Sequence, residues 1–410
     1  MDAINQADTG WLLVSCALVM LMTPGLALFY GGMVSSKNVL SSFMHSFIAL
    51  GIITLQWVVI GYSLAFGADA GGGFVGGFDY AFLNGVGLAP LEDSTIPHIL
   101  FMAFQMMFAI ITPALISGAI AERMKFSAYV LFIVLWATLV YDPICHWVWG
   151  PDGWLGARGA LDFAGGTVVH LSSGAAALIC ALILGRRLRP APPHNLTLTL
   201  LGAGLLWFGW FGFNAGSALA SNESAALALV NTHLAAGAAA LSWAIVEWIK
   251  QGKPTALGVA SGLVAGLVCI TPAAGYVGPI SAVVMGLVVG PVCYGAVMLK
   301  GKLGYDDALD AFGIHGVGGA LGAILTGVFA AKAWGGTDGL IGGDTHLLIE
   351  NGIGVLAAAA YSITITFAIL KLIDATVGLR VSNDEEIEGL DTTLHGEEGY
   401  HMAGAGTLTE

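Results

Sequence analysis

Long stretches without a single charged residue limit how this chain can fold. Ten stretches contain no Asp, Glu, Lys or Arg: 9–36, 38–68, 94–121, 126–141, 163–185, 190–222, 224–246, 254–299, 311–331 and 351–370. A transmembrane helix needs about 20 mostly apolar residues. The stretch 254–299 is too long for one span, and the turn-forming residues from Thr271 to Pro279 divide it in two. The sequence therefore predicts eleven membrane-spanning helices.

The composition agrees with a membrane protein. Apolar residues make up 57% of the chain and charged residues 10%, whereas soluble domains contain about 45–50% and about 25%. We therefore predict an all-α integral membrane protein. The 59 glycines lie inside the apolar stretches and favour closely packed helices. The chain lacks the basic patch that nucleic-acid binding requires, which excludes that class of function.

The five cysteines give no sign of metal or redox chemistry. They are scattered through apolar stretches without C-x-x-C spacing, as expected of small buried side chains. We predict no metal site, no cofactor and no enzymatic activity.

Basic residues predict the orientation in the membrane. With an odd number of spans, the two termini lie on opposite sides. One side of the alternating topology carries Lys37, Arg123, Lys125, Arg186, Arg187, Arg189, Lys250, Lys253, Lys300, Lys302, Lys371 and Arg380. Only Arg158 and Lys332 fall on the other side. By the positive-inside rule, the N-terminus is outside and the C-terminus is cytoplasmic, in a multi-pass protein of the cell (inner or plasma) membrane.

The predicted organisation has two parts. Residues 1–374 form the membrane domain, and residues 375–410 form a cytoplasmic tail with eight acidic residues from Asp384 onward. An odd span number with unlike ends favours an inverted repeat of five plus five spans, at about 9–190 and 196–331, followed by a last helix at about 346–374.

Two matching segments support that repeat. In the fifth and tenth spans an Asp precedes a His by eight residues, as Asp162 with His170 and Asp307 with His315. At about 1.5 Å per residue, each His lies roughly 12 Å inward, near the midplane of a core about 30 Å thick. The two spans enter from opposite faces, so we expect the two histidines to be neighbours.

An intramembrane histidine is costly and therefore usually functional. The alternative is a packing histidine bonded to a backbone carbonyl, which is our interpretation of His45 and His233. For His170 and His315 the matched spacing favours function. Neutral imidazoles donate from one nitrogen and accept at the other, so the pair can line a path for a small N–H species or relay a proton.

Aromatic residues cluster at the predicted outer ends of the fourth and sixth spans. Trp149 and the segment 210–217, which ends at Ser217, lie beside Asp142 and Asp162 in the predicted topology. Aromatic faces with a hydroxyl and a nearby acid could bind a small cation. The alternative is the aromatic belt that membrane proteins carry at the interface.

Several motifs together closely resemble the ammonium transporter family (Amt/MEP/Rh), of the prokaryotic Amt type. They are Phe29-Tyr30-Gly31-Gly32-Met33-Val34, Gly118-Ala119-Ile120-Ala121-Glu122-Arg123, Asp162-Phe163-Ala164-Gly165-Gly166-Thr167-Val168-Val169-His170, the segment 210–217, Phe312-Gly313-Ile314-His315-Gly316 and Gly389-Leu390-Asp391-Thr392-Thr393-Leu394-His395-Gly396-Glu397. The resemblance runs from the first span into the tail.

The resemblance implies a homotrimer with one pore in each subunit. It assigns the outer ammonium site to Trp149, Phe108, Phe213 and Ser217, with Phe108 and Phe213 also forming a stacked gate. It makes His170 and His315 the twin histidines of an apolar pore, and Asp162 an electrostatic support of the outer site. It also implies that the tail segment 378–398 is ordered under the pore and responds to a PII-type signalling protein.

These observations predict a transporter or channel that binds ammonium, removes a proton and conducts ammonia past the histidines, with possible separate proton transfer and with methylammonium as a substrate analogue. The alternative is an ammonium sensor that signals through its tail. An anion or sugar carrier is disfavoured, because the spans lack the intramembrane Arg or Lys and the polar lining that such substrates need.

Overall fold

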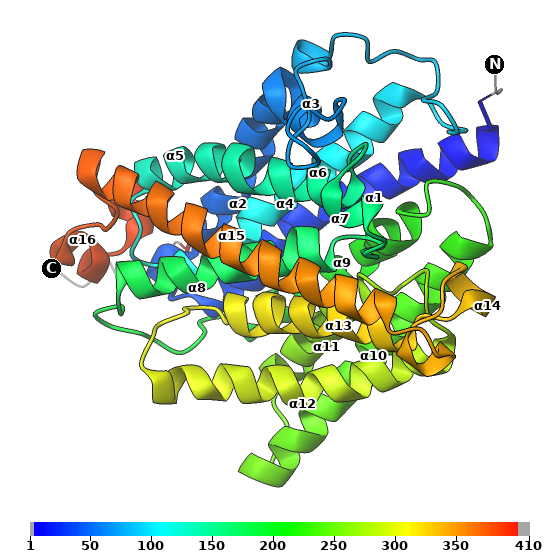
Figure 1. Ribbon diagram of the computed structural model, residues 1–410. Coiled ribbons are helices and arrows are strands. Elements are labelled where there is room, and N and C mark those ends of the chain that lie inside the picture. Colours follow the sequence, from blue (N-terminus) through cyan, green and yellow to red (C-terminus); the bar gives the residue numbers. More distant parts are fainter. Residues whose placement is uncertain (1–3, 401–410) are drawn as a thin grey trace, which may run out of the picture.

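The computed structural model describes residues 4–400, which form a bundle of helices (Figure 1). Within these residues there are four isolated β-bridges and no strand. The α-helices are α1 (Gln6–Met33), α2 (Val39–Gln56), α3 (Tyr62–Phe66), α4 (His98–Ile120), α5 (Phe126–Trp136), α6 (Asp142–Trp149), α7 (Trp154–Ala157), α8 (Ser172–Leu184), α9 (Leu196–Gly216), α10 (Glu223–Gln251), α11 (Ala256–Ile270), α12 (Pro279–Leu303), α13 (Val317–Phe329), α14 (Lys332–Gly335), α15 (His346–Thr376) and α16 (Asn383–Glu388).

Ten helices, counting continuous runs as one, are long and apolar enough to cross a membrane. The all-α membrane architecture is therefore confirmed. The long stretch 254–299 divides as predicted, into α11 and α12. However, α11 has only 15 residues, so the count of eleven spans and the orientation of the termini stay predictions.

The fourth span extends beyond its charge-free stretch and reaches its predicted outer end at Trp149. The uncharged stretch 126–141 stops at Asp142, but the helix continues through it to Trp149. Asp142 is fully buried, and its carboxyl group accepts a hydrogen bond of 2.7 Å from Nε2 of Gln56 on α2. A charge-free stretch misses this extension because a hydrogen-bonded acid can lie inside a membrane helix bundle.

π-Helical turns of five or six residues lie within two of the spans and at the start of two others. They are η2 (Trp57–Gly61), η4 (Ala137–Tyr141), η5 (Gly166–Leu171) and η6 (Phe312–Gly316). Such turns are rare and frequently mark functional sites. His170 lies in η5 and His315 in η6, so both halves of the chain place their histidine in the same kind of irregular turn.

Reciprocal glycine contacts hold these two helices together. A Cβ atom added to Gly174 would lie 2.1 Å from the backbone nitrogen of Gly316. A Cβ atom added to Gly319 would lie 2.7 Å from the carbonyl oxygen of Gly166. Each of Gly174 and Gly319 follows its histidine by four residues. This mutual contact is what an inverted repeat predicts, although the repeat boundaries themselves stay a prediction.

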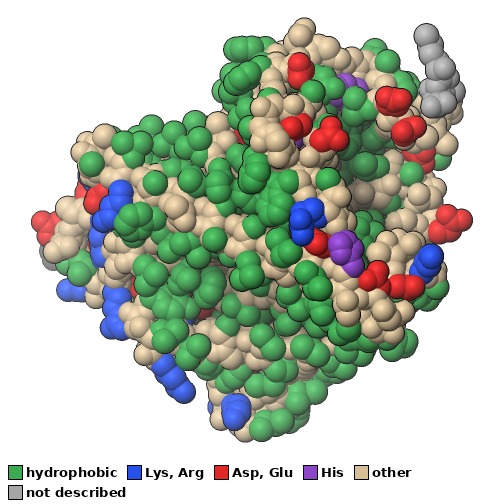
Figure 2. All heavy atoms as spheres, in the orientation of Figure 1, with side chains coloured by type: hydrophobic (Ala, Val, Ile, Leu, Met, Phe, Trp, Pro, Cys, Tyr) green, Lys and Arg blue, Asp and Glu red, His purple; other side chains and the backbone are tan. Residues whose placement is uncertain are grey.

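Charge is distributed unevenly over the surface. The start of α1 and the helix α16 lie on opposite sides of the bundle, and most Lys and Arg side chains visible in Figure 2 gather at the end where α16 lies in Figure 1. This is the end that the sequence predicts to be cytoplasmic. The opposite end shows more Asp and Glu. The arrangement agrees with the charge separation on which the predicted orientation rests.

The predicted tail is packed against the membrane domain as far as residue 400. The Asp391 carboxylate accepts hydrogen bonds from the N–H groups of Leu40 and Ser41 at the start of α2, and Arg380 donates to the carbonyl of Leu184 on α8 at 2.8 Å. These contacts hold the described tail at the predicted cytoplasmic end. The rest of the tail, 401–410, lies outside the described residues.

The glycine contact predicts a sensitivity to added volume. Replacing Gly174 with Ala should lower the thermal stability of the purified protein in detergent, by about 1–3 kcal/mol, because the methyl group forces η5–α8 away from η6. Gly51→Ala is the matched control, since nothing lies within 4 Å of an added Cβ there. Equal melting temperatures for the two variants would contradict the contact.

Candidate functional site

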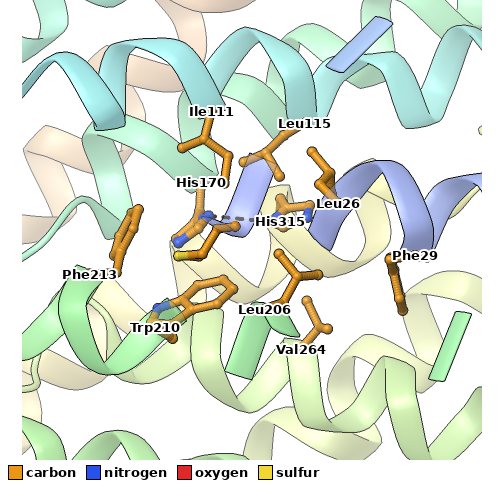
Figure 3. A pocket seen from close by; sticks show the side chains of 11 residues that line it. Leu26, Phe29, Ile111, Leu115, His170, Leu206, Trp210, Phe213, Val264 and His315 are labelled. Carbon is orange, nitrogen blue, oxygen red and sulfur yellow. Dashed lines mark hydrogen bonds between the residues drawn. The ribbon is translucent and has the colours of Figure 1, made fainter. Parts of the chain in front are cut away.

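The two predicted histidines are neighbours inside the bundle, as expected. The Nδ1 atoms of His170 and His315 are 3.3 Å apart, and the rings lie 5.3 Å apart with an angle of 23° between their planes (Figure 3). Both side chains are buried. Because a neutral imidazole has one N–H and one acceptor nitrogen, one Nδ1 must donate to the other, which gives the pair a direction.

The two aspartates that precede the histidines cap their helices. Asp162 accepts four backbone N–H groups at 2.7–3.1 Å, those of Gly165, Gly166, Thr167 and Val168. Asp307 accepts those of Ala311 and Phe312 at 3.1 and 2.8 Å. An acid at a helix N-terminus satisfies N–H groups that otherwise lack partners and complements the helix dipole. The same Asp–His spacing therefore occurs in both segments because each Asp caps the helix that carries its histidine.

Burial raises the pKa of both carboxyl groups, and hydrogen-bond donors or a nearby cation oppose the shift. Burial raises the pKa of Asp162, while the four backbone N–H groups act to lower it. Burial also raises the pKa of Asp307 to about 6; the Asp310 carboxylate adds to the shift, and Lys300 opposes it.

A narrow apolar cavity surrounds the histidines. The space open to the centre of a water-sized molecule is about 10 Å³, which is room for about one such molecule. Its lining consists of Met22, Leu26, Phe29, Ile111, Leu115, His170, Leu206, Trp210, Phe213, Val264 and His315 (Figure 3). No Asp, Glu, Lys or Arg is among these residues, so the imidazole nitrogens and the Trp210 indole are the polar groups of the lining.

A wider cavity lies on the other side of Phe108. It has a volume of about 200 Å³ and is lined by Phe66, Phe101, Gln105, Phe108, Trp149, Phe163, Ser217 and Leu219. The structure thus brings together Trp149, Phe108 and Ser217, which the resemblance assigned to one site. Ser217 Oγ donates to the carbonyl of Phe213 at 2.8 Å, which leaves its lone pairs free to accept. Aromatic faces with free acceptors suit a small cation with N–H groups.

Two phenylalanines in close contact lie between the cavities. The ring centroids of Phe108 and Phe213 are 4.2 Å apart with 34° between the ring planes, and both side chains are buried. Phe108 lines the wider cavity, whereas Phe213 lines the narrow one and stacks on His170. The pair therefore lies between the linings of the two cavities.

Asp162 does not line either cavity. Its carboxylate is occupied by the N–H groups of η5, and its backbone carbonyl accepts the indole N–H of Trp149 at 2.8 Å. Asp162 therefore connects the two predicted sites through the backbone: one end of the residue holds the helix of His170, and the other holds Trp149.

Comparison with known proteins identifies the family. The sequence profile described as Ammonium Transporter Family matches residues 10–400. The chain belongs to the ammonium transporter family. An ammonium transporter from Bacillus subtilis (strain 168) is 52% identical over 403 residues, covering 97% of this chain and 99% of the relative. The family resemblance predicted from the motifs is thereby confirmed.

Solved structures of family members have the same fold. Saccharomyces cerevisiae Mep2 superimposes with a TM-score of 0.89 at 40% identity, covering 93% of this chain and 88% of Mep2. A structure titled Sensor Amt Protein superimposes with a TM-score of 0.88 at 31% identity, covering 94% of this chain and 97% of that protein. The structural similarity therefore includes both a Mep2 protein and a protein whose title describes it as a sensor.

Some lining residues were not singled out as site residues from the sequence. Gln105 lines the wider cavity, and its Oε1 atom is buried without a hydrogen-bond partner among the described residues. Phe163 and Trp210 also line a cavity. One signal was available for Gln105, since it is a polar residue inside an otherwise apolar span, three residues before Phe108. Among residues 4–400 no group of three or more His, Cys, Asp or Glu could hold a metal ion.

Removing the Asp162 charge should weaken the site and the fold together. In Asp162→Asn only one side-chain oxygen remains to serve four N–H groups, so two of them lose their acceptor. We expect a loss of about 1–3 kcal/mol in stability, measured by thermal unfolding in detergent, together with reduced transport in proteoliposomes. Asp152→Asn, an exposed residue of the same outer loop, is the control and should leave both unchanged.

Proposed function

We propose that the chain is an ammonium transporter that binds ammonium in the wider cavity and conducts ammonia through the narrow one. The observation that carries the proposal is the sequence of the two cavities: an aromatic site with free acceptors, then the contacting pair Phe108 and Phe213, then an uncharged cavity with two histidines. In the wider cavity, Trp149, Phe108 and Ser217 would hold the cation by cation–π attraction and hydrogen bonding.

The narrow cavity favours the neutral species. Placing a full charge at the bilayer centre costs at least about 2.5–3.5 kcal/mol, and no acidic side chain lines this cavity to offset it. Ammonia carries no charge and fits a space of about one water molecule. Ammonium would therefore lose its proton near the phenylalanine pair, which would act as the gate, before it passes His170.

The proton can follow a separate path along the histidines. The 3.3 Å contact between the two Nδ1 atoms is a hydrogen bond, so a proton accepted on one ring can be passed on through the other. The Nε2 nitrogens, which take no part in this contact, can accept from or donate to ammonia. The histidine pair thus offers both a lining for ammonia and a relay for the proton.

Replacing either histidine with Leu should lower the ammonium-elicited current in proteoliposomes, by about tenfold or more if the pair transfers protons. His233→Leu is the control, because His233 stacks on Trp207 and lines neither cavity, so its current should equal that of the unchanged protein. Unchanged currents in both His170→Leu and His315→Leu would refute the relay.

A second candidate function is an ammonium sensor that signals through its cytoplasmic tail. The structural match to a protein titled Sensor Amt Protein favours keeping this alternative. The two functions differ in whether substrate crosses the membrane. Uptake of labelled methylammonium by the unchanged protein would support transport, whereas binding of ammonium without any uptake would support a sensor alone.

The proposal includes the family context that the resemblance implies. The protein would be a homotrimer of eleven-span subunits in the cell membrane, with the N-terminus outside and with a PII-type protein acting at the cytoplasmic face. The tail 375–410 would couple the subunits. In support, the described tail makes specific contacts with the membrane domain: Leu390 donates to Asn38, and the N–H of Leu188 donates to Glu386.

Truncation after Val381 tests the role of the tail. It removes the Asp391 carboxylate that accepts the N–H groups of Leu40 and Ser41, so the cytoplasmic start of α2 should loosen. We expect loss of PII binding in pull-down experiments and loss of cooperativity in the transport curve. A variant shortened only to residue 400 is the control and should behave like the full chain. An unchanged response after the longer truncation would contradict a regulatory tail.

A further inference from the structure

The last long helix, α15, supplies no residue to the lining of either cavity. Its outer end nevertheless binds the segment 158–161 through hydrogen bonds and an ion pair, and this segment leads directly into Asp162. This segment is part of the outer loop between Trp149 on α6 and the start of η5 (Figure 1). The contacts are too specific for ordinary helix packing, because polar side chains of α15 bind the backbone of this segment.

Asn351 makes the central contact. Its Oδ1 atom accepts the N–H of Leu161 at 2.9 Å, and its Nδ2 atom donates to the carbonyl of the same residue at 3.2 Å and to that of Ala323 at 2.8 Å. Asn351 is 3% exposed. A single buried amide therefore fixes both backbone groups of Leu161 and ties them to α13.

A neighbouring ion pair adds to the contacts between α15 and the segment 158–161. Arg158 donates through Nε and Nη2 to both carboxylate oxygens of Glu350, at 2.7 and 2.9 Å. This two-point geometry is the strong form of the Arg–carboxylate contact. His346 adds a contact of 3.0 Å to the carbonyl of Arg158. Successive residues of α15 thus hold both ends of the segment 158–161.

The next residue along the chain carries the effect into the outer site. The carbonyl of Asp162 accepts the indole N–H of Trp149 at 2.8 Å, and Trp149 lines the wider cavity. Holding the Leu161 carbonyl fixes the planar Leu161–Asp162 peptide unit, and with it the position of the Asp162 Cα, so only the φ and ψ rotations of Asp162 separate this unit from the Asp162 carbonyl. The direction of that carbonyl in turn sets the orientation of the indole ring.

We propose that Asn351 is a positioning residue for Trp149, supported by the Arg158–Glu350 pair. The inference rests on the proposed function of the wider cavity as the ammonium site. The outer end of α15 holds the Leu161–Asp162 backbone, and this backbone holds the indole face toward the cation. Asn351 does not touch the substrate and acts only through Trp149.

Asn351→Leu, which keeps the volume but removes both hydrogen-bonding groups, tests the proposal. Loss of indole orientation should raise the half-saturation concentration for methylammonium uptake by about fivefold. The maximal rate per assembled protein should change less than twofold, because the gate and the histidines stay in place. Thr366→Val is the matched control on α15, since it removes a buried hydrogen bond from Trp136 far from the loop. Its half-saturation concentration should stay unchanged.

A double-mutant cycle separates positioning from loss of stability. Trp149→Phe removes the indole N–H that binds the Asp162 carbonyl. In that background Asn351→Leu should change the half-saturation concentration no further. An equal effect with and without the indole would overturn the proposal, as would an effect confined to the maximal rate.

Two further outcomes are distinguishable. If Asn351→Leu fails to assemble, Arg158→Gln provides a milder test, because the Arg158 side chain is 48% exposed; it should raise the half-saturation concentration in the same way, and an unchanged value would refute the proposal.

If the unchanged protein takes up no methylammonium, the proposed transport function fails. If it does and both variants saturate like the unchanged protein, only the positioning role fails.

Discussion

Backbone N–H groups at the start of a helix must find acceptors, and inside a membrane protein water does not supply them. This chain solves the problem twice, with Asp162 at the start of η5 and Asp307 at the start of η6. The caps allow both helices to begin inside the protein rather than at its surface. The histidines eight residues further along can then meet at the centre of the bundle, so the rest of the site depends on these two carboxylates.

Glycine determines how closely the two capped helices approach. At Gly174 and Gly319 the facing backbone occupies the place of a side chain, so the helices cross almost in backbone contact. This crossing brings the imidazoles within hydrogen-bonding distance and keeps the cavity beside them narrow. The width of the narrow cavity is thus a consequence of helix packing, and the same small residues serve both the fold and the proposed selectivity.

Much of this architecture could be predicted from the sequence. The charge-free stretches predict the helices because the thickness of the membrane core sets how many consecutive apolar residues a spanning helix needs. The matched Asp–His spacing predicts the histidine pair because it repeats in both halves. The charge-free stretch alone does not explain how Asp142 can lie inside the fourth span, since this depends on a partner, Gln56, that lies far away in the chain. The π-helical turns and the contacts of Asn351 likewise depend on tertiary packing, which leaves no periodic signal in a single sequence.

The site separates the groups that would touch the substrate from those that hold them. The proposed substrate path is lined by aromatic, aliphatic and uncharged polar side chains, whereas the carboxylates and guanidinium groups lie behind it or at the two ends of the bundle. A charge in the lining would bind a cation and hold it there. Charges one layer further back, such as Asp162, can orient helices and indole rings without trapping the substrate. The charged groups behind the lining therefore orient its side chains, while the lining itself stays uncharged, as the proposed passage of a neutral molecule requires.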